Sequence, residues 1–160
     1  METKTMKNFT PPIVSSLDAH MGFWLRYVSN QVSARFQKLL EDQGTSVTEW
    51  VALRVLFDEP EASHAELIQS LGMTKGAASK VVSRLEEKGL ATRRLAEGSS
   101  KEQVLALTTK GRALVPKLAA LADQNDDHFF GHLSHDERGV LMKTFKNLVA
   151  HHNIKEVPVA

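Results

Sequence analysis

Residues 63–90 read SHAELIQSLGMTKGAASKVVSRLEEKGL, and this stretch decides the fold because it predicts two short helices separated by a glycine-containing turn. Ser63 and Glu66 match the S-x-x-E capping box, so we expect a helix to begin there. That helix should end at Gly72, because glycine readily takes the left-handed conformation that closes a helix. Two short helices joined by such a turn are typical of a helix-turn-helix.

The second helix of this pair is predicted to have an apolar face and a polar face. It begins at Thr74, a suitable N-cap, and runs to about Lys88 before Gly89. At about 100° per residue, the apolar side chains that we expect to pack inward are Ala78, Val81, Val82 and Leu85. The opposite side and its flank carry small, hydroxyl and charged residues: Lys75, Gly76, Ser79, Lys80, Ser83, Arg84 and Glu87. Small residues allow a close approach to a surface, and cations and hydroxyls can reach phosphates or base edges.

Positive charge is concentrated on this segment, although the whole chain is almost neutral. The 160 residues hold 20 Lys and Arg against 19 Asp and Glu, a net charge of +1. Between Met73 and Arg94, six basic residues stand against two acidic ones, so this segment carries +4 and the rest of the chain −3. Such an excess indicates an anionic partner that this segment reaches, with an ordinary solvated helix face as the alternative.

Strands and further helices are predicted around this region. Two strand-like runs, residues 90–95 and 103–107, are joined by a polar loop that is long for a hairpin, so we expect a loose, projecting wing. Apolar residues at steps of three and four predict one helix of about 25 residues from Leu17, and Thr48 is a suitable N-cap for the next. Towards the C-terminus, helices are predicted from Thr108 or Thr109 and from the capping box of Ser134 and Glu137.

The expected fold class is mainly α with a small β-hairpin wing: a winged helix-turn-helix domain plus long N- and C-terminal dimerisation helices. Its parts are a flexible arm, a single domain and a tail: residues 1–16, 17–152 and 153–160. The winged part, 46–111, can close its own small core. The helices at 17–43 and 109–152 carry apolar faces that it cannot cover, so we expect two copies to pair with two-fold symmetry.

The run 63–90 resembles the winged helix-turn-helix of the MarR family of bacterial transcription regulators. The resemblance extends through Arg93-Arg94 and the segment LALTTKG at 105–111, and covers roughly residues 15–152. Its more specific part is RLEEKGL followed by L-T-x-x-G. The resemblance implies a repressor that binds a pseudo-palindromic operator as a homodimer and is often released by a small phenolic or anionic ligand.

The residues expected to contact double-stranded DNA lie on the second helix, on the strand after it and at the wing tip: Thr74, Lys75, Gly76, Ser79, Lys80, Ser83, Arg84, Arg93, Arg94 and Lys101. In the family, the wing tip commonly carries an Asp and Arg pair, and the Arg enters the minor groove. Here residues 98–101 read GSSK, without either. We expect Lys101 to contact a phosphate and the wing to discriminate sequence less well, because lysine lacks the planar fork of arginine.

An effector site is the next expectation, because the family tends to bind ligands between the first helix and the winged part. The residues that could line it are His20, Met21, Trp24, Trp50 and Arg54. A cation beside aromatic rings suits a carboxylate or phenolate, with plain core packing as the alternative. His128 and His132 stand four residues apart, but the tight spacing of a four-ligand metal site is absent, so we expect no metal.

Several classes of protein are excluded by what the sequence lacks. With no cysteine, a disulfide framework, a thiolate zinc site and a thiol switch are ruled out. Phosphate-binding glycine loops and the hydrolase and zinc-protease motifs are missing, so we expect neither catalysis nor a cofactor. The start has no apolar signal core, and no run of about 18 apolar residues occurs, so we expect a cytoplasmic protein with no membrane partner.

One alternative from a different class stays open: a winged-helix module that binds proteins and no longer binds DNA. It is favoured by the missing wing arginine and by the balance of nine basic and nine acidic residues over 44–111. The clustering of the basic residues on one helix favours DNA instead.

Overall fold

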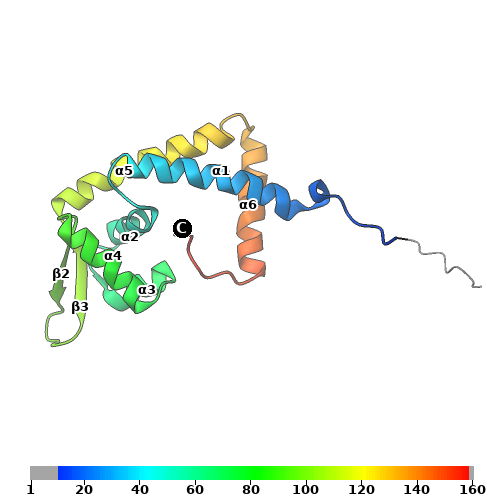
Figure 1. Ribbon diagram of the computed structural model, residues 1–160. Coiled ribbons are helices and arrows are strands. Elements are labelled where there is room, and N and C mark those ends of the chain that lie inside the picture. Colours follow the sequence, from blue (N-terminus) through cyan, green and yellow to red (C-terminus); the bar gives the residue numbers. More distant parts are fainter. Residues whose placement is uncertain (1–10, 159–160) are drawn as a thin grey trace, which may run out of the picture. The chain divides into compact units, whose positions relative to one another are not determined.

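The structure, a computed structural model, describes residues 11–158, and their order of helices and strands is that of a winged helix-turn-helix (Figure 1). In chain order the elements are η1 Leu17–Ala19, α1 Met21–Glu41, α2 Val47–Asp58, β1 Ala62–Ser63, α3 His64–Leu71, α4 Lys75–Glu87, β2 Ala91–Leu95, β3 Gln103–Leu107, α5 Thr109–Phe130 and α6 His135–His151. The expected class, mainly α with a small β wing, is confirmed. The chain divides into two compact units, residues 1–31 and 32–160. Parts of the expected arm and tail, 1–10 and 159–160, lie outside the described residues.

The helix-turn-helix forms as the capping residues predict. The Ser63 hydroxyl accepts from the Glu66 amide at 3.1 Å, and the Glu66 carboxylate accepts from the Ser63 amide at 2.7 Å. Gly72 ends α3 in the left-handed region at φ 61°, and the Thr74 side chain caps α4. The predicted inward face of α4 is confirmed, since the four apolar residues at 78, 81, 82 and 85 are all buried.

The sheet contains one strand that the sequence did not predict. β3 pairs antiparallel with β2 on one side and with the two-residue strand β1 on the other. Two residues are too few to show the alternation by which strands are recognised, which is why β1 was missed. Because β1 leads directly into α3, the wing is bonded to the start of the helix-turn-helix.

The predicted start of the second helix, at Thr48, is wrong. Ser46 is the N-cap of α2, and its hydroxyl accepts from the Glu49 amide at 3.1 Å while the Glu49 carboxylate accepts from the Ser46 amide at 3.0 Å. Ser46 and Glu49 thus form the same S-x-x-E capping box that marks α3. The two hydrogen bonds of this capping box stabilise a helix start at Ser46 more than the one hydrogen bond that a cap at Thr48 offers.

The first long helix begins later than the apolar pattern predicts. Residues 17–19 form a short 3₁₀ turn, His20 is extended, and α1 starts at Met21. The His20 ring lies 3.0 Å from the Ser16 carbonyl oxygen, and the Trp24 indole donates to the Asp18 carbonyl at 2.8 Å. Side chains thus form hydrogen bonds with carbonyl groups that, in a continuous helix, would accept from backbone amides.

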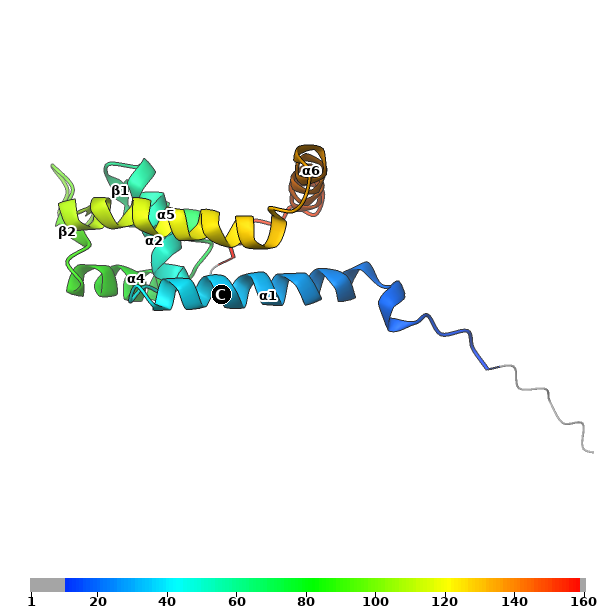
Figure 2. The ribbon, with the colours of Figure 1, turned by 90° about the horizontal axis from the view of Figure 1, so that it is seen from above.

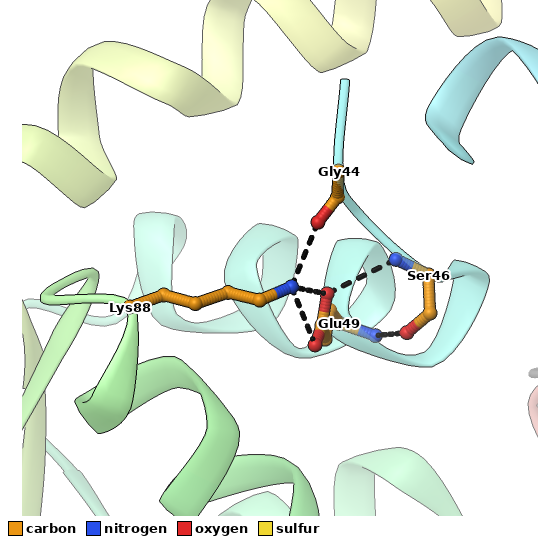
Figure 3. Close-up of polar contacts among 4 residues, drawn as sticks. All are labelled: Gly44, Ser46, Glu49 and Lys88. Carbon is orange, nitrogen blue, oxygen red and sulfur yellow. Dashed lines mark hydrogen bonds and ion pairs between the residues drawn. The ribbon is translucent and has the colours of Figure 1, made fainter. Parts of the chain in front are cut away.

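An ion pair between an exposed lysine and a buried carboxylate joins the end of α4 to the start of α2 (Figure 3). The Glu49 side chain is 4% exposed, and its two oxygens accept from the Lys88 ammonium at 2.8 and 2.9 Å. Lys88 also donates to the Gly44 carbonyl at 2.7 Å, in the loop between α1 and α2. One lysine therefore holds α4 to two separate segments of the chain.

The same turn, residues 88–90, is held from its other side by the start of α5. The Thr108 hydroxyl caps α5 by accepting from the Gly111 amide, and it donates to the Gly89 carbonyl at 2.6 Å. Gly111 itself packs against backbone, because a Cβ there would stand 2.1 Å from the Leu90 carbonyl oxygen. The L-T-x-x-G pattern therefore has a structural cause, since only glycine fits where α5 meets this turn.

The core of the second unit forms around α2, which lies between α5 and the α3–α4 pair (Figure 2). Leu53 and Leu56 of α2 are fully buried there with Leu118 of α5. By contrast, α6 has no buried residue, and it turns away from α5 at the end of that helix (Figures 1 and 2). Among residues 11–158, no helix combines the length and the apolar character that a membrane span needs.

The first prediction concerns Lys88. Lys88→Met should lower the free energy of unfolding by about 1–3 kcal/mol, because it leaves the buried Glu49 carboxylate without its cation. Guanidinium denaturation at matched protein concentration measures this change.

Lys110→Met is the matched control, since the Lys110 ammonium donates to the exposed Lys88 carbonyl and not to a buried charge. It should cost less than about 1 kcal/mol. Equal losses in both variants would show that the ion pair is no more important than a surface hydrogen bond.

Candidate nucleic-acid interface

The outer face of α4 presents cations that the rest of the fold does not neutralise. Lys75, Lys80 and Arg84 are exposed, and within residues 11–158 none of them forms an ion pair. The Ser79 and Ser83 side chains stand between them and are half-buried. The structure thus brings together on one helix most of the residues predicted to contact DNA.

Gly76, at the second position of α4, has no packing role within residues 11–158. A Cβ built there meets nothing within 4 Å, and the backbone is not left-handed. Since glycine costs up to about 1 kcal/mol relative to alanine inside a helix, its presence favours an external reason. A close approach of this turn to a partner surface is such a reason.

The two arginines of β2 are engaged within the fold. The Arg93 guanidinium donates to the Glu86 carboxylate at 2.9 Å and to the Ser83 hydroxyl at 3.3 Å. Arg94 pairs with Glu61, in the segment before β1. These contacts hold the hairpin against α4 and the segment before β1, and a DNA contact by either arginine stays a prediction.

The wing loop is held by its own hydrogen bonds, although its length predicted a loose one. The Ala96 amide donates to the Glu102 carbonyl at 2.8 Å, and the Ser99 hydroxyl accepts from the amides of Lys101 and Glu102. Lys101 is exposed at the tip, and its ammonium forms no ion pair among the described residues. It is therefore available to an external anion.

His64 is a residue that the sequence did not single out as functional. It is half-buried at the first position of α3, and its Nε2 lies 3.4 Å from the Ser79 hydroxyl oxygen. Burial lowers the pKa of the His64 imidazole below its usual 6.5, and the cations Arg93 and Lys75 lower it further. In the sequence, the only feature that could have pointed to His64 is its position directly after a helix N-cap, and His135 has the same position.

Two of the predicted effector residues, Trp50 and Arg54, have different surroundings on α2. Trp50 lines a cavity of about 360 Å³ with Phe36, Val51 and Asn125, to which Val157 of the C-terminal segment also contributes. Arg54 lies outside this lining: it pairs with Asp58 at 2.7 Å and stacks over the Phe57 ring. The expected cation beside aromatic rings is thus present, but at another place on α2.

The other three predicted effector residues, His20, Met21 and Trp24, belong to the first compact unit. The Trp24 ring contacts Phe23 edge-on, at 5.3 Å between centroids, and both Trp24 and Met21 are exposed. Exposed apolar side chains of this kind suit a protein surface as well as a ligand. For the metal question, the described residues hold no group of three His, Asp or Glu side chains that could bind an ion.

In comparisons with known proteins, this chain is similar to transcription regulators. Residues 43–101 match the family model described as the MarR family. The transcriptional regulator HosA of Escherichia coli O111:H- is 25% identical over 125 residues, which are 78% of this chain and 91% of HosA. The HTH-type transcriptional repressor Rv2887 of Mycobacterium tuberculosis is 29% identical over 117 residues, 73% of this chain and 84% of the repressor.

A solved structure shares the fold. BpsR of Bordetella bronchiseptica, whose DNA binding is regulated by 6-hydroxynicotinic acid, matches with a TM-score of 0.73 at 22% identity. The match covers 84% of this chain and 96% of BpsR.

Gly76 gives the second prediction. Gly76→Ala should weaken binding to duplex DNA by about 1–3 kcal/mol, because the added methyl group meets a closely approaching surface. The fold should keep its stability or gain up to about 1 kcal/mol. Fluorescence anisotropy and denaturation measure the two effects. Gly139→Ala on α6, where a Cβ also meets nothing within 4 Å, is the control. A DNA affinity unchanged by Gly76→Ala would contradict the close approach.

Proposed function

We propose that this chain is a winged helix-turn-helix transcription regulator of the MarR family and that it represses transcription as a homodimer bound to a pseudo-palindromic operator. The observation that carries the proposal is the outer face of α4. Its inward face is fixed in the core, so the unpaired cations Lys80 and Arg84 point away from it, with Lys75 on the flank.

In this proposal α4 enters the major groove with its N-terminal end leading. The free backbone amides and partial positive charge of that end favour a phosphate, and Gly76 allows a close approach. Lys80 lies one turn into the helix and reaches a phosphate or a guanine edge. Arg84 lies a further turn along and contacts the phosphate backbone.

Dimerisation is supported by apolar side chains that the single chain leaves exposed. On α6 they include Val140, Met142, Phe145, Leu148 and Val149, each at least 40% exposed. On the first unit they include Leu17, Met21, Trp24, Leu25 and Val28. A two-fold interface covers such faces and sets two α4 helices about one DNA turn apart, ~34–36 Å.

The remaining assignments follow the same proposal. Residues 46–111 bind DNA, and the helices within 17–43 and 109–152 make the dimer. The protein acts in the cytoplasm, where its DNA is, and as a regulator it performs no catalysis. Loss of DNA binding, with the winged part used for protein contacts, is the competing function that the experiment below separates.

A second candidate function is the binding of a small effector in the cavity beside Trp50. Phe36, Val51 and Trp50 give it aromatic and aliphatic walls. Asn125 is buried in its lining, and its side chain bonds Arg35 and the Val32 carbonyl. Because none of the described residues that line the cavity is a cation, a neutral phenol fits better than a carboxylate.

The third prediction tests DNA binding. Lys80→Ala and Arg84→Ala should both leave the fold intact, because both side chains are exposed. If each removes one phosphate contact per copy, the slope of log K against log salt should flatten by about 0.9 per contact, or about 1.8 per dimer. A base contact by Lys80 should instead cost about 1–3 kcal/mol per half-site, at particular operator bases only.

The measurement is a salt titration of operator and random duplexes, with circular dichroism to verify folding. Lys143→Ala, which removes an exposed cation from α6, is the control and should leave the slope unchanged. Unchanged affinity in both folded α4 variants would favour the protein-interaction function.

The fourth prediction concerns the cavity. In a Trp24→Phe variant, Trp50 is the remaining tryptophan, since the sequence has two. Phenol should quench its fluorescence with saturation, and benzoate should do so only at higher concentration. Ala122→Leu, which fills the cavity, should abolish the saturable quenching. Quenching that benzoate and phenol share equally, or that survives Ala122→Leu, would place the ligand elsewhere.

A further inference from the structure

A polar cleft lies beside the outer face of α4, between the start of α3 and the wing. It has a volume of about 580 Å³. The side chains that matter here come from four parts of the chain: His64 of α3, Lys75 and Ser79 of α4, Arg93 of β2, and Lys101 and Glu102 of the wing loop. Three of these residues are cations and one is an acid, so the cleft favours an anion.

His64 is placed to respond to such an anion. Its Nε2 lies 3.4 Å from the Ser79 hydroxyl, and Lys75 and Arg93 are the cations that act on its ring. Of the nearby acids, Glu66 accepts from the Ser63 amide, and Glu86 pairs with Arg93 and offsets part of its charge. On the wing side, the positive charge of Lys101 and the negative charge of Glu102 offset each other.

We propose that this cleft binds a backbone phosphate of the DNA and that His64 takes up a proton from solvent as the phosphate enters. This inference rests on the proposed function, because the phosphate comes from the duplex that α4 contacts. The phosphate charge offsets the repulsion from Lys75 and Arg93, and the protonated ring gains a donor at Nε2 for the phosphate oxygens. The proton returns to solvent when the DNA leaves.

The source of the phosphate follows from the position of the cleft. Lys75 and Ser79 lie one turn apart on α4, and Lys80 follows directly on the outer face. A duplex that contacts Lys80 therefore brings its backbone past the cleft.

The sign of the effect follows from proton linkage. The free protein keeps His64 neutral near neutral pH, because its pKa is lowered. Binding that adds a proton strengthens as the pH falls, by up to about tenfold per pH unit for each copy. The folded state itself loses stability as the pH falls below 6.5, where the unfolded chain takes up the proton more readily.

The test measures, by fluorescence anisotropy, the affinity for a labelled random-sequence duplex at about pH 7.5 and at about pH 6. From the higher to the lower pH, the affinity of the wild-type protein should rise at least about tenfold more than that of His64→Gln. A random duplex suffices because backbone contacts do not depend on sequence. His135→Gln is the matched control, since His135 is also the first residue of a helix with a serine capping box. It should keep the wild-type pH dependence.

Loss of the extra pH dependence in His64→Gln alone supports the inference. The same pH dependence in wild type and His64→Gln overturns it, while duplex binding keeps the proposed function. Absence of duplex binding at both pH values overturns this inference and the proposed function together. NMR titration of the His64 ring in the wild-type protein needs no variant: the duplex should raise its midpoint. An equal rise with inorganic phosphate alone would overturn the assignment to the DNA backbone.

Discussion

The ion pair between Lys88 and the buried Glu49 carboxylate is the contact on which the position of α4 depends. Lys88 follows the last turn of α4, so its ammonium fixes that end of the helix to α2 and, through Gly44, to the loop after α1. Thr108 and Gly111 fix the following residues of the same turn to α5. A helix can read DNA only in a defined orientation. Four segments of the chain meet at this turn and define the orientation of α4.

The fold divides its basic residues into two groups with different tasks. Lys88, Arg93 and Arg94 bond carboxylates of the same chain and hold α4, the hairpin and the segment before β1 together. Lys80 and Arg84 have no such partner among the described residues, and they lie on one face of α4. The winged part can therefore be neutral in total and still present a positive surface to an anion.

Local signals predicted most of the fold, and contacts between distant residues explain what they missed. Capping boxes and glycines mark α3, α4 and α6 correctly, because they act within four residues of one another. One miss was local: Ser46 was passed over as the cap of α2, although Ser46 and Glu49 form an S-x-x-E capping box. The role of His64 depends on Ser79, 15 residues away, and Arg54 turns to Asp58 rather than to the cavity of Trp50. Such pairings leave no periodic trace in a sequence.

The two-residue strand β1 also protects the sheet against aggregation. Because β1 pairs with Val104 and Leu105, it covers the middle of the β3 edge that faces away from β2. The exposed edges of the sheet are then β1, which is too short to template another strand, and β2, which carries the charged pair Arg93 and Arg94. Short and charged edges are the features that discourage strand addition by a neighbouring chain. A projecting wing, which must stay exposed to reach DNA, can in this way remain in solution without recruiting further copies through its backbone.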